Sequence, residues 1–235
     1  MGRIDLDRLR RTPAYPFAEA AHYLDLPKST LRAWCLGQRY VSKGEPRCFK
    51  PLIRLDGERH EGLSFLNLVE AHVLTAIRRV HGVSLRKVRK ALDYVSKTLE
   101  VSRPLADAQF RTNGVDLFVE ELGRLVNASK DGQLEMASML IAHLERVDRD
   151  PAGVPIKLYP FTRRPVGGDA PAPVEIDPRV AFGRPVLKGR GVPTAVLADR
   201  FKAGDSLREL AGDYDAAPEE IEEAIRCELD RRAAA

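Results

Sequence analysis

The chain has 235 residues, 44% of them hydrophobic and 31% charged, which is typical of a folded globular protein. No apolar run approaches the roughly 18 to 20 residues of a membrane-spanning helix, and the charged first five residues lack the apolar core of a signal peptide. Cys35, Cys48 and Cys227 are an odd, scattered set that does not form a disulfide framework. We therefore expect a cytoplasmic protein without a membrane partner.

Charge is unevenly distributed along the chain, although the net charge is only +4. Residues 1–100 contain 19 basic and 11 acidic side chains, whereas residues 204–235 contain 4 and 10. A basic N-terminal part and an acidic C-terminal end indicate two surfaces with different partners, one of them a polyanion. Ordinary scatter of solvated charge is the alternative interpretation.

The stretch from Tyr15 to Trp34 predicts two short helices joined by a tight turn. Small and apolar residues at helical spacing form the inward face, and an Asp-Leu-Pro turn separates the helices. This pattern is typical of a helix-turn-helix, whose second helix offers polar donors to base edges and phosphates. The candidate groove-contacting residues at the start of the second helix are Lys28, Ser29, Thr30 and Arg32.

Residues 39–50 follow as β-capable segments around a glycine-containing basic turn. A basic hairpin beside a recognition helix is the pattern of a wing and suits contact with phosphates or the minor groove. The candidate wing residues are Lys43, Arg47 and Lys50.

Two further helices are predicted, one over 65–80 after a Ser64 cap and one over 84–99. Together with the Ser29–Trp34 motif, the wing and the Leu63-Ser64-Phe65 entry, they make the chain resemble the MerR-like winged helix-turn-helix family over roughly residues 15–100. The resemblance implies a DNA-binding domain over residues 1–100 that binds a palindromic operator as a two-fold dimer. A module that binds only other proteins is the alternative.

Residues 101–159 are predicted to form a small mixed α/β segment that connects the domains or supports a dimer. Phe110–Val119, centred on Asn113-Gly114, has the pattern of a strand, a turn and a second strand. A helix is expected over about 133–147. Residues 160–173 follow, and their prolines and glycines predict a linker.

The remaining residues, 174–235, are predicted to form a C-terminal three-helix module. Short extended pieces are expected at 174–176 and 185–187, followed by helices at about 194–202, 206–213 and 218–232. The overall fold class is therefore mainly α with small β elements.

A signature runs through the C-terminal module: Asp-Pro at 177, Phe-Gly-Arg-Pro-Val from 182, Val-Pro at 192 and Gly-Asp-Ser from 204. It is similar to the domain-of-unknown-function 433 family, with one departure, because Gly189-Arg190-Gly191 stands where that family usually has Gly-Thr-Arg. Joined to a MerR-like domain, it resembles the VapB-type antitoxins of type II toxin–antitoxin systems. The resemblance implies a PIN-like ribonuclease toxin of the VapC type as partner, in a hetero-oligomer with the antitoxin.

The glycine-rich loop of this module gives a physical route to inhibition. PIN-like nucleases hold Mg²⁺ with clustered carboxylates, so cationic side chains on a closely approaching loop could replace the positive charge of the metal. A turn with merely solvated cations is the alternative. The candidate toxin-binding residues are Arg179, Arg184, Lys188 and Arg190.

No catalytic pattern accompanies these motifs. The chain lacks a phosphate-binding loop sequence, a dinucleotide fingerprint and a histidine pair at metal-ligand spacing, so we expect no enzyme activity, no metal and no cofactor. The predicted function is an antitoxin that inhibits a PIN-like ribonuclease and represses its own operon. The alternatives are a stand-alone MerR-like transcription regulator with a C-terminal sensing module, and a protein–protein adaptor that does not bind DNA.

Overall fold

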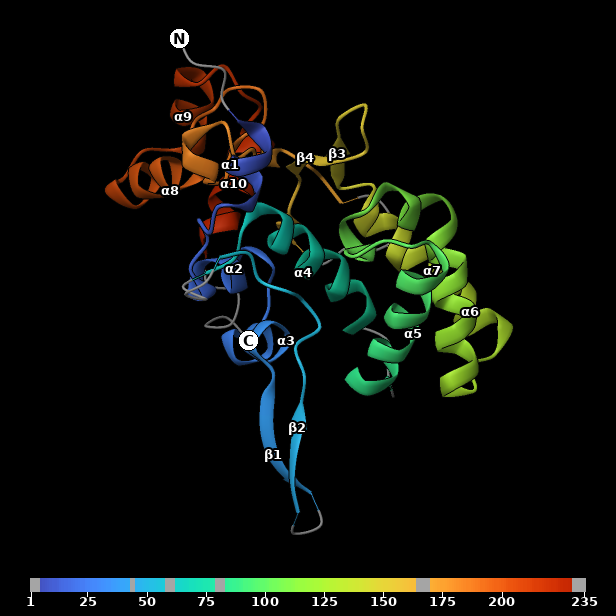
Figure 1. Ribbon diagram of the computed structural model, residues 1–235. Helices are drawn as coiled ribbons and strands as arrows, with labels where there is room; N and C mark the ends of the chain where they lie inside the picture. The colour runs from blue at the N-terminus through green and yellow to red at the C-terminus, as the bar shows by residue number, and fades with distance from the viewer. Residues whose placement is uncertain (1–4, 43–44, 58–61, 79–82, 164–169, 230–235) are drawn as a thin grey trace.

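The computed structural model describes residues 5–42, 45–57, 62–78, 83–163 and 170–229. Helices dominate, and three two-stranded antiparallel sheets accompany them (Figure 1). The N-terminal elements are α1 (Leu6–Arg11), α2 (Phe17–Tyr23), α3 (Lys28–Leu36), β1 (Gln38–Ser42), β2 (Glu45–Phe49), α4 (Phe65–Arg78) and α5 (Leu85–Thr98). The central elements are η1 (Pro104–Ala106), η2 (Phe110–Gly114), α6 (Val115–Val126), α7 (Lys130–Leu144), β3 (Val147–Arg149) and β4 (Pro155–Leu158). The C-terminal elements are β5 (Val174–Glu175), η3 (Ala181–Gly183), β6 (Val186–Leu187), α8 (Thr194–Ala203), α9 (Leu207–Asp213) and α10 (Pro218–Glu228).

Helices α2 and α3 confirm the predicted helix-turn-helix, and β1 pairs with β2 as the predicted wing. Ala20 and Ala21 are buried, so their small side chains let the two helices approach closely. Asp25 in the turn adopts a left-handed conformation with φ 51°, and Leu26 N donates to Ala21 O at 2.8 Å. These contacts reverse the chain between the helices.

Helix α4 is the central element of the fold. All residues from Phe65 to Ile77 are buried, because α1, α7 and η1 pack around it (Figure 1). Helix α5 has a strongly amphipathic sequence, and its apolar side, which includes Val88 and Val95, faces the core. Both helices agree with the sequence prediction.

The predicted strand-turn-strand over Phe110–Val119 is wrong. Residues Phe110–Gly114 form one π-helical turn that leads directly into α6, and the Asn113-Gly114 pair lies within this helical run. Burial decides the outcome: Val115, Phe118 and Leu122 at helical spacing pack toward α5 and α7. Helix α7 also begins at Lys130 and ends at Leu144, earlier at both ends than the predicted helix over about 133–147.

The C-terminal module follows the sequence prediction and has a core of its own. Strands β5 and β6 pair, and α8, α9 and α10 surround a separate apolar cluster that includes Leu197, Leu210 and Ile221. An antiparallel bridge between Leu158 and Ile176 joins the module to β4. Helix α10 ends at Glu228, earlier than the predicted end at about 232, and Leu229 after it is extended. Residues from 230 onward lie outside the described part of the chain.

Candidate nucleic-acid interface and partner surface

Helix α3 combines a buried and an exposed side. Leu31, Trp34 and Cys35 face the core. The opposite side carries the predicted contact residues: Lys28, Ser29 and Arg32 are exposed, and Thr30 is half-buried. The structure therefore brings the four candidates together at the leading end of one helix, with Thr30 closest to the interior.

Arg32 is oriented by an aromatic ring of the preceding helix. Its guanidinium carbon lies 5.3 Å from the ring centroid of Phe17 on α2. A cation held over an aromatic face is restrained in direction while it keeps its donors in solvent. The sequence pattern marked Phe17 only as a core residue, so its second role comes from the structure.

The wing leaves the body of the molecule directly after α3 (Figure 1). Gly37 makes the junction with φ 77°, and a Cβ at this position would lie 2.4 Å from Phe49 O, so only glycine fits here. Lys50 is exposed at the base of the wing. Arg47 lies on β2 opposite Tyr40, and Lys43 falls outside the described residues.

Arg89 on α5 fixes the base of the wing, a role that sequence reasoning did not assign. Its guanidinium donates to the backbone carbonyls of Lys50 and Pro51, the latter at 2.5 Å, and lies 5.4 Å from the centroid of the Phe49 ring. Helix α5 thereby holds the exit of the wing in place. The predicted helix over 84–99, which is part of the resemblance to the MerR-like family, was the available signal, but it gave no individual role to Arg89.

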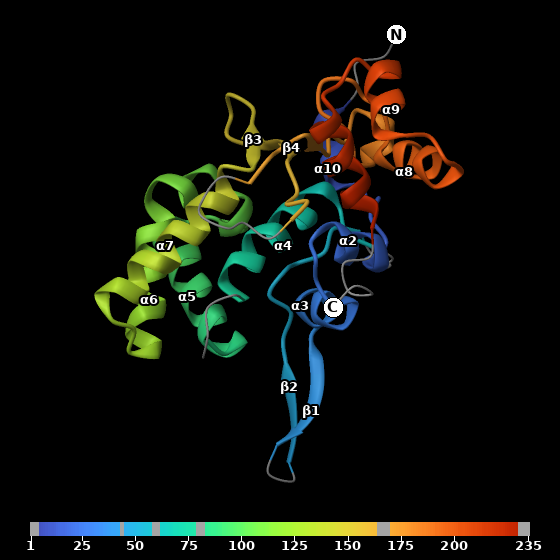
Figure 2. The same ribbon diagram turned by 180° about the vertical axis from the view of Figure 1, so that it is seen from behind.

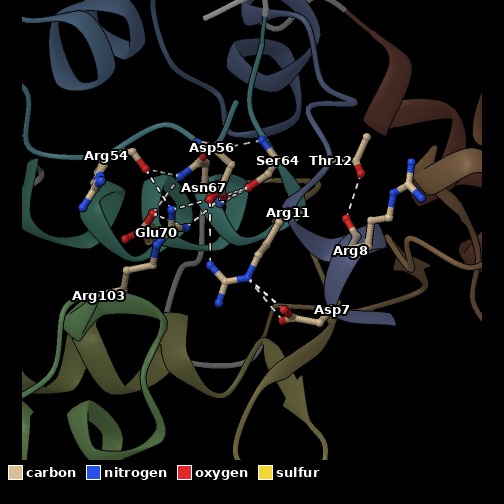
Figure 3. Close-up of polar contacts among 10 residues, drawn as sticks. All are labelled: Asp7, Arg8, Arg11, Thr12, Arg54, Asp56, Ser64, Asn67, Glu70 and Arg103. Carbon is tan, nitrogen blue, oxygen red and sulfur yellow. Dashed lines mark hydrogen bonds and ion pairs between the residues drawn. The ribbon is translucent and has the colours of Figure 1, made fainter. Parts of the chain in front are cut away.

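A buried polar network supports the same region from inside the molecule. Arg103 donates to both carboxylate oxygens of Asp56, at 2.6 and 3.0 Å, and Ser64 Oγ donates to Asp56 at 2.6 Å (Figure 3). Asn67 Nδ2 donates to Arg54 O at 2.9 Å. The network thus joins the segment after the wing to α4 and to the residues before η1.

Glu70 belongs to this network and is fully enclosed. It accepts a hydrogen bond from Asn67 at 3.0 Å and lies 3.7 Å from Arg103. Burial raises the pKa of Glu70 to about 7, although Arg103 and Asn67 act in the opposite direction. The carboxyl group is consequently a stability determinant whose charge changes near neutral pH.

The predicted toxin-binding residues are all exposed, but each has a contact within the chain. Arg179 binds Asp177 at 2.6 Å, and Lys188 Nζ lies 4.8 Å from the ring centroid of Tyr159. Arg190 donates to Asp215 O at 2.8 Å and lies 3.4 Å from Glu220. The structure therefore distributes these cations over several elements and does not converge them on one point.

Arg184 connects the C-terminal module to the helix-turn-helix. It forms an ion pair with Glu19 on α2, and beside it Gly183 packs against Tyr15, where a Cβ would lie 2.4 Å from the Tyr15 hydroxyl oxygen. Burial raises the pKa of Tyr23 to about 12, although the nearby Arg184 guanidinium lowers it. The helix-turn-helix and the C-terminal module are thus in direct contact, which the sequence did not indicate.

A pocket of about 490 Å³ lies at this contact. Helix α2 contributes one wall, and the module contributes the other through the segment after η3, the start of α8 and the end of α10, which lies near α2 in both views (Figures 1 and 2). The lining residues include His22, Tyr23, Arg184, Thr194 and Glu228.

Neither a metal site nor a membrane span is found in the described part of the chain. No group of three or more His, Cys, Asp or Glu side chains there is placed to hold a metal ion. No described helix is both long enough and apolar enough to cross a bilayer.

Comparisons with known proteins match both ends of the chain. Residues 13–92 match the model of a family described as a putative DNA-binding HTH domain, and residues 174–226 match a protein family of unknown function, DUF433. The chain thus combines a helix-turn-helix, which α2 and α3 form, with a C-terminal segment that is similar to the DUF433 family. An N-terminal helix-turn-helix and a C-terminal DUF433 module, both expected from the sequence, are thereby confirmed.

Two relatives from Mycobacterium tuberculosis are similar over nearly the whole length. The putative antitoxin VapB45 is 29% identical over 91% of this chain and 92% of its own length. The uncharacterized protein Rv2308 is 26% identical over 90% of this chain and 88% of its own length. The first of these names agrees with the resemblance to a VapB-type antitoxin.

A solved structure confirms the fold. The crystal structure of Rv2018 from Mycobacterium tuberculosis superimposes with a TM-score of 0.65, covers 92% of this chain and 98% of its own, and is 24% identical. At this level of identity the likeness concerns the fold alone.

Proposed function

We propose that this chain is an antitoxin that binds operator DNA with its N-terminal domain and neutralises a PIN-like ribonuclease toxin with its DUF433 domain. The observation that carries the proposal is the combination of both domains in one chain, with the same extent as a relative named as a putative antitoxin. The protein acts by binding in this proposal and has no catalytic role.

The DNA-binding part of the proposal rests on the geometry of α3 and the wing. Lys28, Ser29, Thr30 and Arg32 lie at the leading end of α3, where polar donors reach base edges in a major groove. Lys50 is exposed at the base of the wing and supplies positive charge for phosphates, and Lys43 and Arg47 are the further candidates that the sequence gives for this contact. A two-fold dimer would place two such helices on a palindromic operator in its own promoter and so repress the operon.

The toxin-binding part of the proposal rests on the exposed cations of the C-terminal module. Arg179, Arg184, Lys188 and Arg190 are accessible, and their present partners are an ion-paired carboxylate, a ring or a carbonyl. An acidic nuclease site offers carboxylates that can take the place of these partners.

Two measurements on the full chain test the two parts separately. Fluorescence anisotropy should show tighter binding to the DNA upstream of its own gene than to a random duplex of equal length, with affinity that falls steeply as salt rises. Co-expression should restore the growth of cells that are arrested by the product of the neighbouring gene, which this proposal expects to be a PIN-like ribonuclease. Equal affinity for both duplexes contradicts specific operator binding, and unrelieved arrest contradicts the antitoxin function.

The pocket between α2 and the module favours one second candidate, a stand-alone regulator that senses a small molecule. A ligand in this pocket would touch Glu19 and Tyr23 on one side and Arg184 and Thr194 on the other, and so link the module to the DNA-reading helices. A metabolite that changes operator affinity without any toxin present would support this candidate over the antitoxin.

A further inference from the structure

The turn η3 presents a large aromatic side chain almost completely to solvent. Phe182 is 96% exposed, more than any other large apolar side chain in the part of the chain that the structure describes, where Val41 follows with 74%. An isolated Phe in this position has no role in the core of the module. Aromatic side chains displayed in this way are typical anchors of protein–protein interfaces.

The backbone that carries Phe182 is strained. Ala181, Phe182 and Gly183 follow one another with φ 46°, 56° and 77°, and the first two are residues for which the left-handed region is unfavourable. Such strain persists only where the surroundings hold it, and it clusters at binding and switch sites.

The neighbours of the turn hold it from both sides. Gly183 N donates to Val180 O at 2.8 Å, and Gly183 packs against the hydroxyl of Tyr15, which directly precedes α2. The next residue, Arg184, pairs with Glu19 on α2. The ring of Phe182 is therefore projected by a fixed support, which lowers the entropy lost when it binds.

The acidic side chains near Phe182 are buried, whereas the basic ones are exposed. The carboxylates of Asp177 and Glu175 are buried at 1% and 4% exposure, whereas Arg179, on the same segment, is exposed. The turn with Lys188 and Arg190 lies close by, because a Cβ on Gly191 would be 3.6 Å from Val180. Exposed cations thus flank the apolar tip along the chain, with Arg179 before it and Arg184 after it.

We propose that Phe182 is the anchor through which the DUF433 domain binds the toxin, and that its ring enters an apolar pocket with carboxylates at the rim. This inference rests on the proposed antitoxin function and deepens it, because it assigns the main contact to a ring instead of the cations. The cations would then select an acidic partner and orient it around the ring.

Binding of full-length variants to the purified product of the neighbouring gene, which the proposed function expects to be a PIN-like ribonuclease, tests the inference by isothermal titration calorimetry. Phe182→Gly removes the ring and also relieves the left-handed strain, so the variant should unfold at the same or a higher temperature than the wild type. We expect its affinity for the toxin to fall by about 30-fold or more. The matched control is Phe201→Ala, an exposed phenylalanine on α8, which should change affinity less than threefold.

The outcomes separate the anchor from the function. Wild-type binding with a large loss only in Phe182→Gly supports the anchor. Wild-type binding that Phe182→Gly retains overturns the anchor and leaves the antitoxin function standing. Absence of wild-type binding overturns both. A wild-type dimer that Phe182→Gly converts to a monomer in sedimentation, with unchanged toxin affinity, assigns the ring to a second copy of this chain and also overturns the anchor.

Discussion

The start of α3 and the base of the wing, together called the DNA-reading edge here, differ from the C-terminal module in the way their cations are paired, and the contrast is clearest for the arginines of the module. Within the described residues, Lys28, Arg32 and Lys50 have no carboxylate partner, whereas Arg179, Arg184 and Arg190 each pair with an acidic side chain. An unpaired cation offers its full charge to a phosphate and releases counterions when it binds. A paired cation must exchange one partner for another, so it contributes selectivity and little net affinity. Basic side chains thus suit a nucleic acid where they are unpaired and an acidic protein where they are paired.

The contact between the two regions should produce the largest effect when it is broken. Gly183→Ala would place a Cβ 2.4 Å from the Tyr15 hydroxyl oxygen and force a non-glycine residue to φ 77°. Steric overlap and left-handed strain together should lower the free energy of unfolding by about 3 kcal/mol. Urea denaturation measures this change.

Gly189→Ala is the matched control for this substitution. Gly189 has a similar φ of 73°, but nothing lies within 4 Å of the Cβ position. Only the backbone strain remains, so the loss should be about 1 kcal/mol. Equal losses of unfolding free energy in both variants would show that the Tyr15 contact does not hold the C-terminal module against the helix-turn-helix.

The buried carboxylate beneath the wing should give the next largest effect, and it depends on pH. Unfolded Glu70 loses its proton near pH 4.5, whereas burial raises the pKa in the folded protein to about 7. The folded state therefore binds more protons between these values, and stability falls as pH rises through this window and then levels off. Relative to Glu70→Gln, the wild type should lose up to about 3 kcal/mol between pH 4.5 and 7.5.

Thermal unfolding of both proteins across this pH range provides the measurement. The glutamine variant keeps an oxygen that can accept from Asn67 and has no charge to bury. Glu135→Gln, at an exposed position of α7, serves as the control and should follow the wild-type profile. A constant difference between the wild type and Glu70→Gln at all pH values would contradict the raised pKa.

Local patterns were sufficient to predict the elements that carry the DNA-reading edge. The apolar residues of α2 and α3 recur at helical spacing, and the turn between them is encoded by Asp25-Leu26-Pro27, so neighbouring residues determine the helix-turn-helix. The three helices of the C-terminal module were predicted for the same reason. The exposed start of α3 then followed from the inward positions of Leu31 and Trp34.

Features that depend on distant residues were not predicted. The Asn113-Gly114 pair is a strong hairpin signal, but burial of Phe110 and Phe118, whose rings lie 6.0 Å apart, favours a helical run. The Arg184–Glu19 pair joins residues 165 positions apart across a proline-rich segment. Nothing in the local sequence of either residue indicates the other, so the docking of the module on α2 needed the structure.

The reading edge should show an effect of intermediate size. Arg32→Ala should weaken binding to operator DNA by about 1–3 kcal/mol and leave binding to random DNA almost unchanged, because a donor directed at base edges contributes specificity. Lys50→Ala should instead weaken both by a similar factor and reduce the salt dependence by about one phosphate contact. Anisotropy titrations at several salt concentrations distinguish the two. Equal losses on both duplexes for both variants would reassign Arg32 to the phosphate backbone.

The paired cations should give the smallest effect on stability. The side chains of Arg184 and Glu19 are 50% and 33% exposed, so water screens their attraction. A double-mutant cycle with Arg184→Ala and Glu19→Ala should therefore yield a coupling of about 0.5 kcal/mol in the free energy of unfolding. A weak internal pair of this kind lets Arg184 exchange Glu19 for a carboxylate of the toxin at little cost. A coupling well above 1 kcal/mol would instead show that Arg184 holds the module to the helix-turn-helix, and it would contradict a role of Arg184 in toxin binding.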